Sequence, residues 1–230
     1  MTVPEMHLAV KLGLDKTSNF ALPSLLPEEI DYWLNEGQLQ VVKQKAFGNN
    51  FRQEDLNTGV KRIDDLAPLI KESISFSSSI ITQHSNYTNV KTLARLQPAI
   101  SDYMFFISAT CKYNNNKVGE AKLIPYTSIN NLVVTEYNRP FLRNPYVYIT
   151  NDYFNFIINP DSTLSSVSFR YIKTPKQLVR TSPVGEQTTE SELPDQVHPE
   201  IVAATVSMLL ENLESQRVQT NEVQLSIVVS

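Results

Sequence analysis

The spacing of apolar residues near the N-terminus has the period of an α-helix. Apolar residues recur every three or four positions in three stretches, residues 4–16, 27–47 and 50–67. The second stretch begins at Pro27 and has two glutamates behind it, and both proline and acidic residues suit the first turn of a helix. The sequence therefore predicts a helical part over residues 1–72.

Gly37 interrupts the apolar stripe of the second predicted helix. A glycine inside a helix costs about 1 kcal/mol relative to alanine. Gly37 therefore indicates either the close approach of a neighbouring element or a tolerated defect.

The period then changes from helical spacing to alternation. Apolar and polar residues alternate over residues 74–80, 90–96 and 103–111, which is typical of β-strands. Residues 144–175 contain three further alternating segments separated by turn residues, and this predicts a three-stranded meander. Residues 73–180 are thus expected to form a mainly antiparallel sheet in the same domain as the helices.

The rest of the chain begins with a polar stretch and continues with a helical pattern. Residues 181–196, "TSPVGEQTTESELPDQ", are expected to form a loop that is too polar to pack. Residues 197–216 have the pattern of a C-terminal helix, with Pro199 near its first position. Helices, strands and a final helix in this order predict an α+β fold with a mainly antiparallel sheet.

Apolar residues cover most of the circumference of the C-terminal helix. One stripe of about 100° is enough for a helix to pack on its own domain. A second stripe, formed by Ile201, Ala204 and Met208, makes these three residues candidates for a subunit interface. The alternative is that the helix lies between two elements of its own fold.

Residues 217–230 are predicted to be an extended assembly arm. The apolar residues of this arm, which are also interface candidates, are Val223, Leu225, Ile227, Val228 and Val229. Burying four such side chains gives about 6–12 kcal/mol, whereas ordering eight residues of backbone costs about 8–16 kcal/mol. We therefore expect the arm to become ordered by pairing with the sheet edge of another chain, either a sister subunit or a further protein of the same assembly.

Composition narrows the classes of function. The chain has 230 residues, of which 41% are hydrophobic and 19% charged, so it can bury a core. Its six glycines form no Gly-rich phosphate loop. The net charge of −4 argues against gripping nucleic acid through its phosphates, but not against enclosing it. The start of the chain lacks a secretory pattern and no apolar run could cross a membrane, so synthesis in a cytoplasm is expected.

Residues capable of chemistry are scattered along the chain. The three histidines have no partner at metal-ligand spacing. Cys111 lies on an alternating strand, where a thiol packs as a small apolar side chain. The acidic pairs at 28–29, 54–55 and 64–65 lie on predicted helices beside basic residues, which is typical of a solvated helix face. We therefore expect no catalytic residues, no cofactor and no metal.

Three stretches of the sequence resemble a known class of phage proteins. They are "LPEEIDYWLNEGQLQVVKQKAF" (26–47), "SFRYIKTPKQLV" (168–179) and "LPDQVHPEIVAATVSMLLENLESQRVQ" (193–219). In this order they resemble neck ring proteins of crAss-like bacteriophages and, more broadly, head–tail adaptor (tail accessory) proteins of podovirus-type phages. Each stretch is short, and it is their order that carries the resemblance.

The resemblance implies a structural virion protein and no enzyme. Such a protein forms a ring of about twelve copies in the phage neck, between the portal and the tail, and DNA passes through its lumen. Its partners would be the portal and other neck ring or tail proteins, and it would reach the virion after synthesis in the host cytoplasm. The assembly arm would then bind a sister subunit or the portal.

Two other classes of function remain open at the level of sequence. One is a non-catalytic module that binds a glycan or a peptide through the aromatic residues between positions 146 and 156. The other is a hydrolase whose site is assembled from carboxylates far apart in the sequence.

Overall fold

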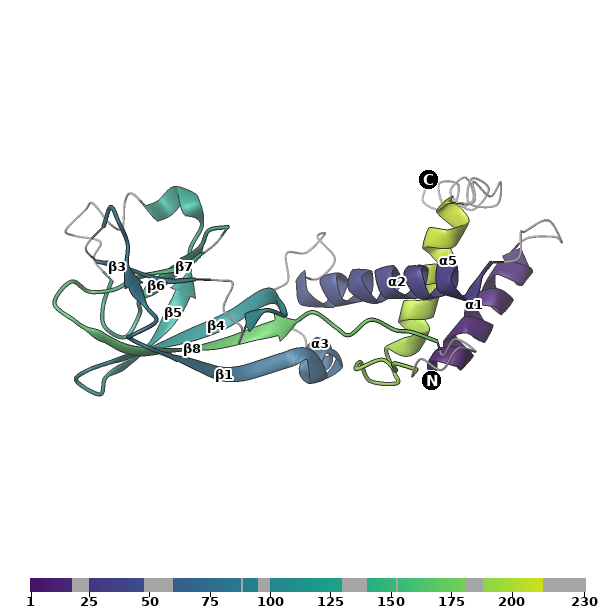
Figure 1. Ribbon diagram of the computed structural model, residues 1–230, viewed down its shortest axis with the longest axis horizontal. Coiled ribbons are helices and arrows are strands. Elements are labelled where there is room, and N and C mark those ends of the chain that lie inside the picture. The colour runs from purple at the N-terminus through teal and green to yellow at the C-terminus, as the bar shows by residue number, and fades with distance from the viewer. Residues whose placement is uncertain are drawn as a thin grey trace, which may run out of the picture. The chain divides into compact units, whose positions relative to one another are not determined.

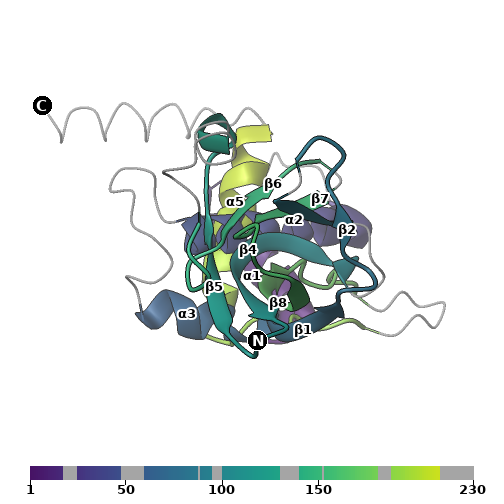
Figure 2. The same ribbon diagram turned by 90° about the vertical axis from the view of Figure 1, so that its left-hand side faces the viewer.

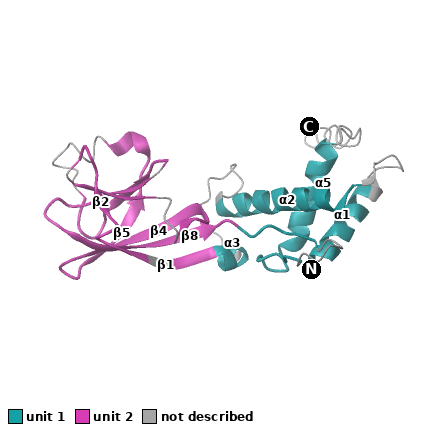
Figure 3. Cartoon of the chain, viewed as in Figure 1, with its two compact units in different colours: residues 1–69, 175–230 teal, residues 70–174 magenta. Residues whose placement is uncertain are grey.

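A computed structural model describes residues 1–17, 25–47, 60–87, 89–94, 100–129, 140–151, 153–180 and 188–212. The chain has α-helices and a curled, mainly antiparallel sheet (Figure 1), so the predicted α+β class is confirmed. The chain is divided into two compact units (Figure 3). Unit 1 comprises residues 1–69 and 175–230, and unit 2 comprises residues 70–174.

Unit 1 is helical. Its elements are α1 (Val3–Thr17), α2 (Pro27–Phe47), α3 (Val60–Leu66), the 3-10 helix η2 (Ala67–Leu69) and α5 (His198–Asn212). The carboxylate of Glu29 accepts a hydrogen bond of 2.9 Å from the backbone N–H of Leu26, so the first turn of α2 is capped by its own acidic residue. Residues 48–59, which include the start of the third predicted helix, lie outside the described residues.

Helix α5 packs closely against α1 and α2, and a glycine lies at each contact. A Cβ on Gly37 of α2 would meet the hydroxyl of Thr205 and would lie 3.1 Å from the carbonyl oxygen of Ile201. A Cβ on Gly13 of α1 would lie 2.8 Å from a methyl carbon of Val206. Gly37 therefore marks the close approach of a neighbouring element, which was one of its two predicted meanings.

In its described residues, unit 2 contains eight strands and a short 3-10 helix, η4 (Tyr126–Ser128). The strands are β1 (Ile70–Ser77), β2 (Thr82–Gln83), β3 (Val90–Ala94), β4 (Tyr103–Tyr113), β5 (Val118–Leu123), β6 (Tyr146–Ile149), β7 (Tyr153–Ile157) and β8 (Leu164–Lys173). Their order in the sheet is β1-β8-β4-β5-β6-β7-β3-β2, and only the β5–β6 pair is parallel. Figure 2 faces this unit and shows the sheet curling. Residues 130–139, between η4 and β6, lie outside the described residues.

The predicted meander over residues 144–175 is wrong in its last pairing. Strands β6 and β7 form an antiparallel pair, but β8 pairs with β1 and β4. The ring of Phe169 on β8 instead packs against Phe154 and Phe156 of β7, at centroid distances of 4.8 and 5.6 Å. Strand β8 thus faces β7 across the core of the curled sheet, because aromatic burial outweighs pairing with the strand that precedes it in the chain.

Candidate assembly surface

The buried stripe of α5 differs from the stripe of Ile201, Ala204 and Met208 that the sequence suggested. Ile201, Thr205 and Leu209 are almost completely buried, and they follow one another at intervals of four residues. Ile201 therefore packs inside its own subunit, as in the alternative interpretation of this helix, and is withdrawn as an interface residue. The sequence did not predict that Thr205 is buried, because only apolar residues were counted and threonine is polar. Its hydroxyl donates to the carbonyl of Ile201 (2.8 Å) and contacts that of Trp33 (3.3 Å).

The two other interface candidates on α5 lie beside this stripe. Ala204 and Met208 are half-buried and lie one turn apart on the helix. Their neighbours Ala203 and Ser207 are exposed, so this flank of α5 borders solvent. Ala204 and Met208 therefore remain candidates. The arm residues Val223, Leu225, Ile227, Val228 and Val229 lie outside the described residues.

Helix α1 adds an exposed apolar pair that the sequence reasoning missed. Leu8 is 59% exposed and Leu12 is 51% exposed, and the two are four residues apart on one face. The opposite face of α1 carries the buried residues Met6, Val10 and Leu14. The sequence did indicate this pair, because Leu8 and Leu12 do not fall on the stripe of apolar residues that is buried.

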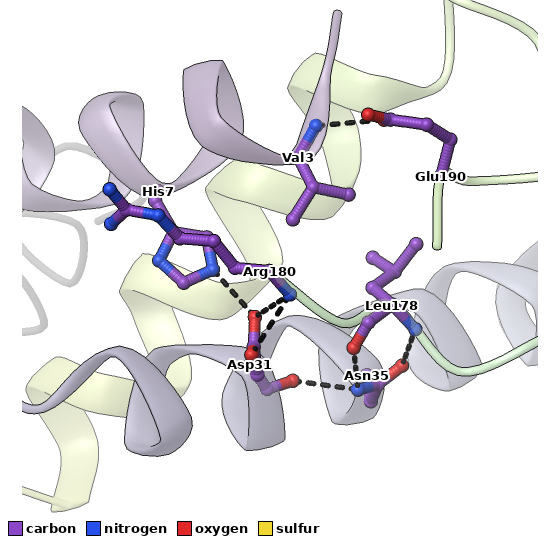
Figure 4. Close-up of polar contacts among 7 residues, drawn as sticks. All are labelled: Val3, His7, Asp31, Asn35, Leu178, Arg180 and Glu190. Atoms are coloured by element: carbon purple, nitrogen blue, oxygen red, sulfur yellow. Dashed lines mark hydrogen bonds and ion pairs between the residues drawn. The ribbon is translucent and has the colours of Figure 1, made fainter. Parts of the chain in front are cut away.

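An extended segment of unit 1, residues 175–180, which we call the strap, lies along α2. Asn35 of α2 pairs with Leu178 of the strap as one strand pairs with another (Figure 4). Its side-chain nitrogen donates to the Leu178 carbonyl at 3.0 Å, and its side-chain oxygen accepts from the Leu178 N–H at 2.7 Å. The same nitrogen also donates to the Asp31 carbonyl at 2.8 Å, which holds the amide in place.

Two further residues of α2 continue this pairing along the strap. Gln38 donates to the carbonyl of Lys176 at 2.9 Å. The carboxylate of Asp31 accepts from the N–H of Arg180 at 3.1 and 3.3 Å. Three polar side chains at helical spacing thus meet alternate residues of an extended chain. Residues 176, 178 and 180 of the strap thus obtain backbone hydrogen bonds from a helix, while Val179 between them forms an antiparallel bridge with Thr189.

A buried histidine shares Asp31 with the strap. His7 of α1 is 1% exposed, and its Nε2–H donates to Asp31 at 2.6 Å. Its Nδ1 has no hydrogen-bond partner among the described residues. Burial lowers the pKa of His7 more than the adjacent Asp31 carboxylate raises it, and Arg180 and Lys11 lower it further. The imidazole is therefore neutral in the folded protein near neutral pH.

A charged cluster joins α2, α3 and α5. Lys45 forms ion pairs of 2.7 Å with both Asp65 and Glu200. Asp65 is 1% exposed and also accepts from the side chain of Gln196 at 2.5 Å. Burial alone would lower the pKa of Lys45, but the hydrogen bonds to the two carboxylates outweigh it and the pKa is raised. Asp65 therefore neutralises a structural cation, and it does not lie on a solvated helix face as predicted.

Residues 188–196 pack on unit 1, so the expectation of a stretch too polar to pack is wrong for this part. Leu193 is buried, and the carboxylate of Glu190 accepts from the N–H of Val3 at 2.8 Å (Figure 4). The polar side chains of the segment serve as partners for backbone groups elsewhere in the unit. Residues 181–187 lie outside the described residues.

Two of the residues considered for chemistry, Cys111 and His198, make structural contacts. Cys111 is fully buried, as its strand position predicted, and burial raises the pKa of its thiol to about 12. The Nε2–H of His198 donates to the carbonyl of Leu193 at 2.9 Å. In the described ranges, no group of three or more metal-ligating side chains comes together. Nor does any of the described helices combine the length and apolarity that a membrane span requires.

No family model matches the sequence, and no curated protein matches it either. The three stretches that carry the phage resemblance nevertheless contact one another within unit 1. Asn35 of the first stretch pairs with Leu178 of the second, and Gly37 of the first lies against Thr205 of the third. Residues 26–47, 175–179 and 193–212 are thus interlocked parts of one packed unit.

Proposed function

We propose that this protein is a structural subunit of an oligomeric ring in the neck of a podovirus-type phage. In this role about twelve copies join the portal to the tail, and DNA passes through the lumen of the ring. The protein would act by assembly and not by catalysis, and it would need no cofactor. Its place would be the virion, after synthesis in the cytoplasm of the bacterial host.

The observation that supports this proposal best is the contact among the three resemblance stretches in unit 1. Short stretches scattered over a chain can match a family by chance. Here their most distinctive positions depend on one another, since the helical glycine at 37 is required by Thr205 and Asn35 holds Leu178. If one packing arrangement maintains the sequence pattern of a family, the distinctive positions of that pattern are expected to contact one another.

The exposed apolar residues of unit 1 are consistent with a subunit that assembles. Leu8 and Leu12 are adjacent on α1 and more than half exposed. Residues of this kind are common at interfaces between copies of a protein, where the patch becomes buried. Ala204 and Met208, together with residues 223–229, are the other surfaces proposed to meet a sister subunit or the portal.

Native mass spectrometry of the full chain, alone and mixed with portal proteins of podovirus-type phages, tests the proposal. The expected species is a homomultimer of about twelve copies, seen as a ring in end-on electron microscopy images. A protein that remains a monomer by itself and in every mixture would contradict the proposal.

A further inference from the structure

Unit 2 contains a cavity lined by aromatic and neutral polar side chains. It has a volume of about 380 Å³, which is within the range of about 300–1,000 Å³ typical of small-molecule sites. Its aromatic walls come from η4, β6 and the segment between β2 and β3. The residues that matter here are His84, Asn86, Tyr87, Tyr126, Thr127 and Tyr148.

The described lining carries no formal charge. No lysine, arginine, aspartate or glutamate is among the residues that line the cavity in the described part of the chain. Burial raises the pKa of Tyr148 to about 12, so its phenol also stays neutral. Phosphate and carboxylate ligands are usually bound by cationic side chains, and metal ions by carboxylates, thiolates or several imidazoles. The chemistry of the lining therefore favours an uncharged ligand.

The polar groups can donate and accept hydrogen bonds at the edge of such a ligand. The backbone N–H of Asn86 donates to Nδ1 of His84 at 3.1 Å. Because Nδ1 accepts this hydrogen bond, the ring proton is on Nε2, which can donate to a ligand. The hydroxyl of Thr127 and the side-chain amide of Asn86 add both donors and acceptors.

The rings of Tyr126 and Tyr148 are arranged for a puckered ligand and not for a flat one. The rings of His84 and Tyr87 are only 5.3 Å apart with planes at 32°, so they leave no room for a flat ligand between them. Tyr126 and Tyr148 have centroids 6.2 Å apart and planes at 75° to each other. A flat heterocycle is held best between parallel rings, as in the stacking of bases. Two rings at a steep angle instead offer a face and an edge, which fit the C–H face of a pyranose ring and its equatorial hydroxyl groups. Tyr126 is 71% exposed, so its ring is free to form that platform.

We propose that this cavity is a binding site for a neutral carbohydrate. Tyr126 supplies the stacking surface, and His84, Asn86 and Thr127 contact the hydroxyl groups of one sugar ring. The site lies within unit 2 and does not depend on the proposed ring function.

Saturation-transfer NMR on the full chain tests this site. The ligands are the methyl glycosides of glucose, galactose, mannose and N-acetylglucosamine at about 10 mM, where a Kd of about 1 mM leaves most sites occupied. Adenosine and glucose 6-phosphate serve as a flat and a charged comparator. We expect transfer to the ring protons of at least one glycoside, and weaker transfer to both comparators.

Two substitutions connect the signal to the cavity. Tyr126→Ala should weaken binding about tenfold, because it removes the stacking ring, while Tyr126→Phe should keep most of it. Tyr32→Ala is the matched control, since Tyr32 is an exposed tyrosine in unit 1. The proposal is overturned if no glycoside gives transfer, if Tyr126→Ala leaves the transfer unchanged, or if adenosine binds more tightly than every glycoside.

Discussion

At the scale of single residues, the contact between Gly37 and Thr205 determines how closely α5 approaches α2. The hydroxyl of Thr205 donates to the carbonyl of Ile201 and contacts that of Trp33, so it cannot easily turn away from Gly37. The carbonyl of Ile201, which is backbone, lies just behind it. A side chain at position 37 would therefore force the two helices apart.

We predict that Gly37→Ala lowers the free energy of unfolding of unit 1 by about 1–3 kcal/mol. Alanine is the better helix former by about 1 kcal/mol, so a loss of stability would show that the clash outweighs propensity. Trp33 is the only tryptophan of the chain and lies on α2, so its fluorescence during urea unfolding reports on unit 1. Gln44→Ala, an exposed change on the same helix, is the control and should stay within about 0.5 kcal/mol of wild type.

The stability of unit 1 should depend on pH through His7. The pKa of His7 in the folded state lies below its ordinary value of 6.5, so between these two values the unfolded chain binds more protons. The contribution is fully present above about pH 6.5 and is lost as the pH falls through the folded pKa, with a slope of at most about 1.4 kcal/mol per pH unit. Urea unfolding followed by Trp33 at a series of pH values measures it.

His7→Gln should remove most of this dependence, because glutamine can donate to Asp31 at a similar position without titrating. His84→Gln serves as the control, since His84 belongs to unit 2. An unchanged pH profile in His7→Gln would assign the dependence to other groups.

At the scale of elements, the strap is held on one edge by side chains of helix α2, and on the other by a single backbone bridge between Val179 and Thr189. Such pairing is difficult to foresee, because Asp31, Asn35 and Gln38 are read in sequence as the polar face of an amphipathic helix. The three residues are spaced by four and three positions, and any polar helix face has this spacing, with or without an extended segment packed on it. The sequence contains no separate signal for the extended partner.

We predict that Asn35→Ala releases the strap. The substitution leaves the N–H and carbonyl of Leu178 without their partners in a partly buried position, at a cost of about 2 kcal/mol, which raises the opened population about 30-fold. Trypsin should then cut after the exposed Lys176 correspondingly faster, with the site identified by mass spectrometry. Gln44→Ala again provides the control, and equal cleavage rates in both variants would show that Asn35 does not hold the strap.

Helix α5 allows assembly to be separated from stability with two neighbouring residues. Leu209 is buried, so Leu209→Ala should lower the stability of the monomer by about 2–5 kcal/mol. Met208 is half-buried on the flank that borders solvent, so Met208→Asp should impair assembly more than Leu209→Ala does. Native mass spectrometry measures the multimer, and Trp33 fluorescence measures the monomer. A complete ring formed by Met208→Asp would remove this flank from the interface.

At the scale of the whole molecule, the sequence predicted the elements of the sheet better than their arrangement. Alternation reveals strands because a strand shows its two faces in turn. It does not say which strand pairs with which, and β8 was misplaced because the decisive contact of Phe169 is made across the core. The division into two units was also not foreseen. Ile70 and Ile172 are paired neighbours in the sheet, so unit 2 begins and ends at one place and needs no linker signal.

The candidate surface was predicted in part for a related reason. A count of apolar residues identified α5 as enclosed on several sides, but it could not tell enclosure by α1 and α2 from enclosure by another copy. Ile201 is buried where Gly37 allows α2 to approach Thr205, and neither a glycine nor a threonine is apolar enough to enter such a count. Leu8 and Leu12 stand out only once the buried face of α1 is known.

The apolar part of the proposed arm, residues 223–230, would need a strand edge of matching length. The sheet of unit 2 ends in β1 and β2, and β2 has only two residues. Among the described strands β1 pairs with β8 alone, and its eight residues match the length of the arm. The outer edge of β1 in a neighbouring copy is therefore our candidate receptor for the arm.

We predict that Leu225→Ser together with Ile227→Ser weakens ring formation or portal attachment and leaves the unfolding of the monomer unchanged. Both residues belong to the apolar face of the arm, and an arm that pairs with another chain contributes nothing to the stability of its own. Gln224→Ala with Ser226→Ala alters the opposite face by a similar number of atoms and should assemble normally. Native mass spectrometry and Trp33 fluorescence give the two readouts. If the double serine variant instead unfolds at markedly lower urea concentration as a monomer, the arm is part of its own subunit's core, and the interface must be sought on α1 and α5.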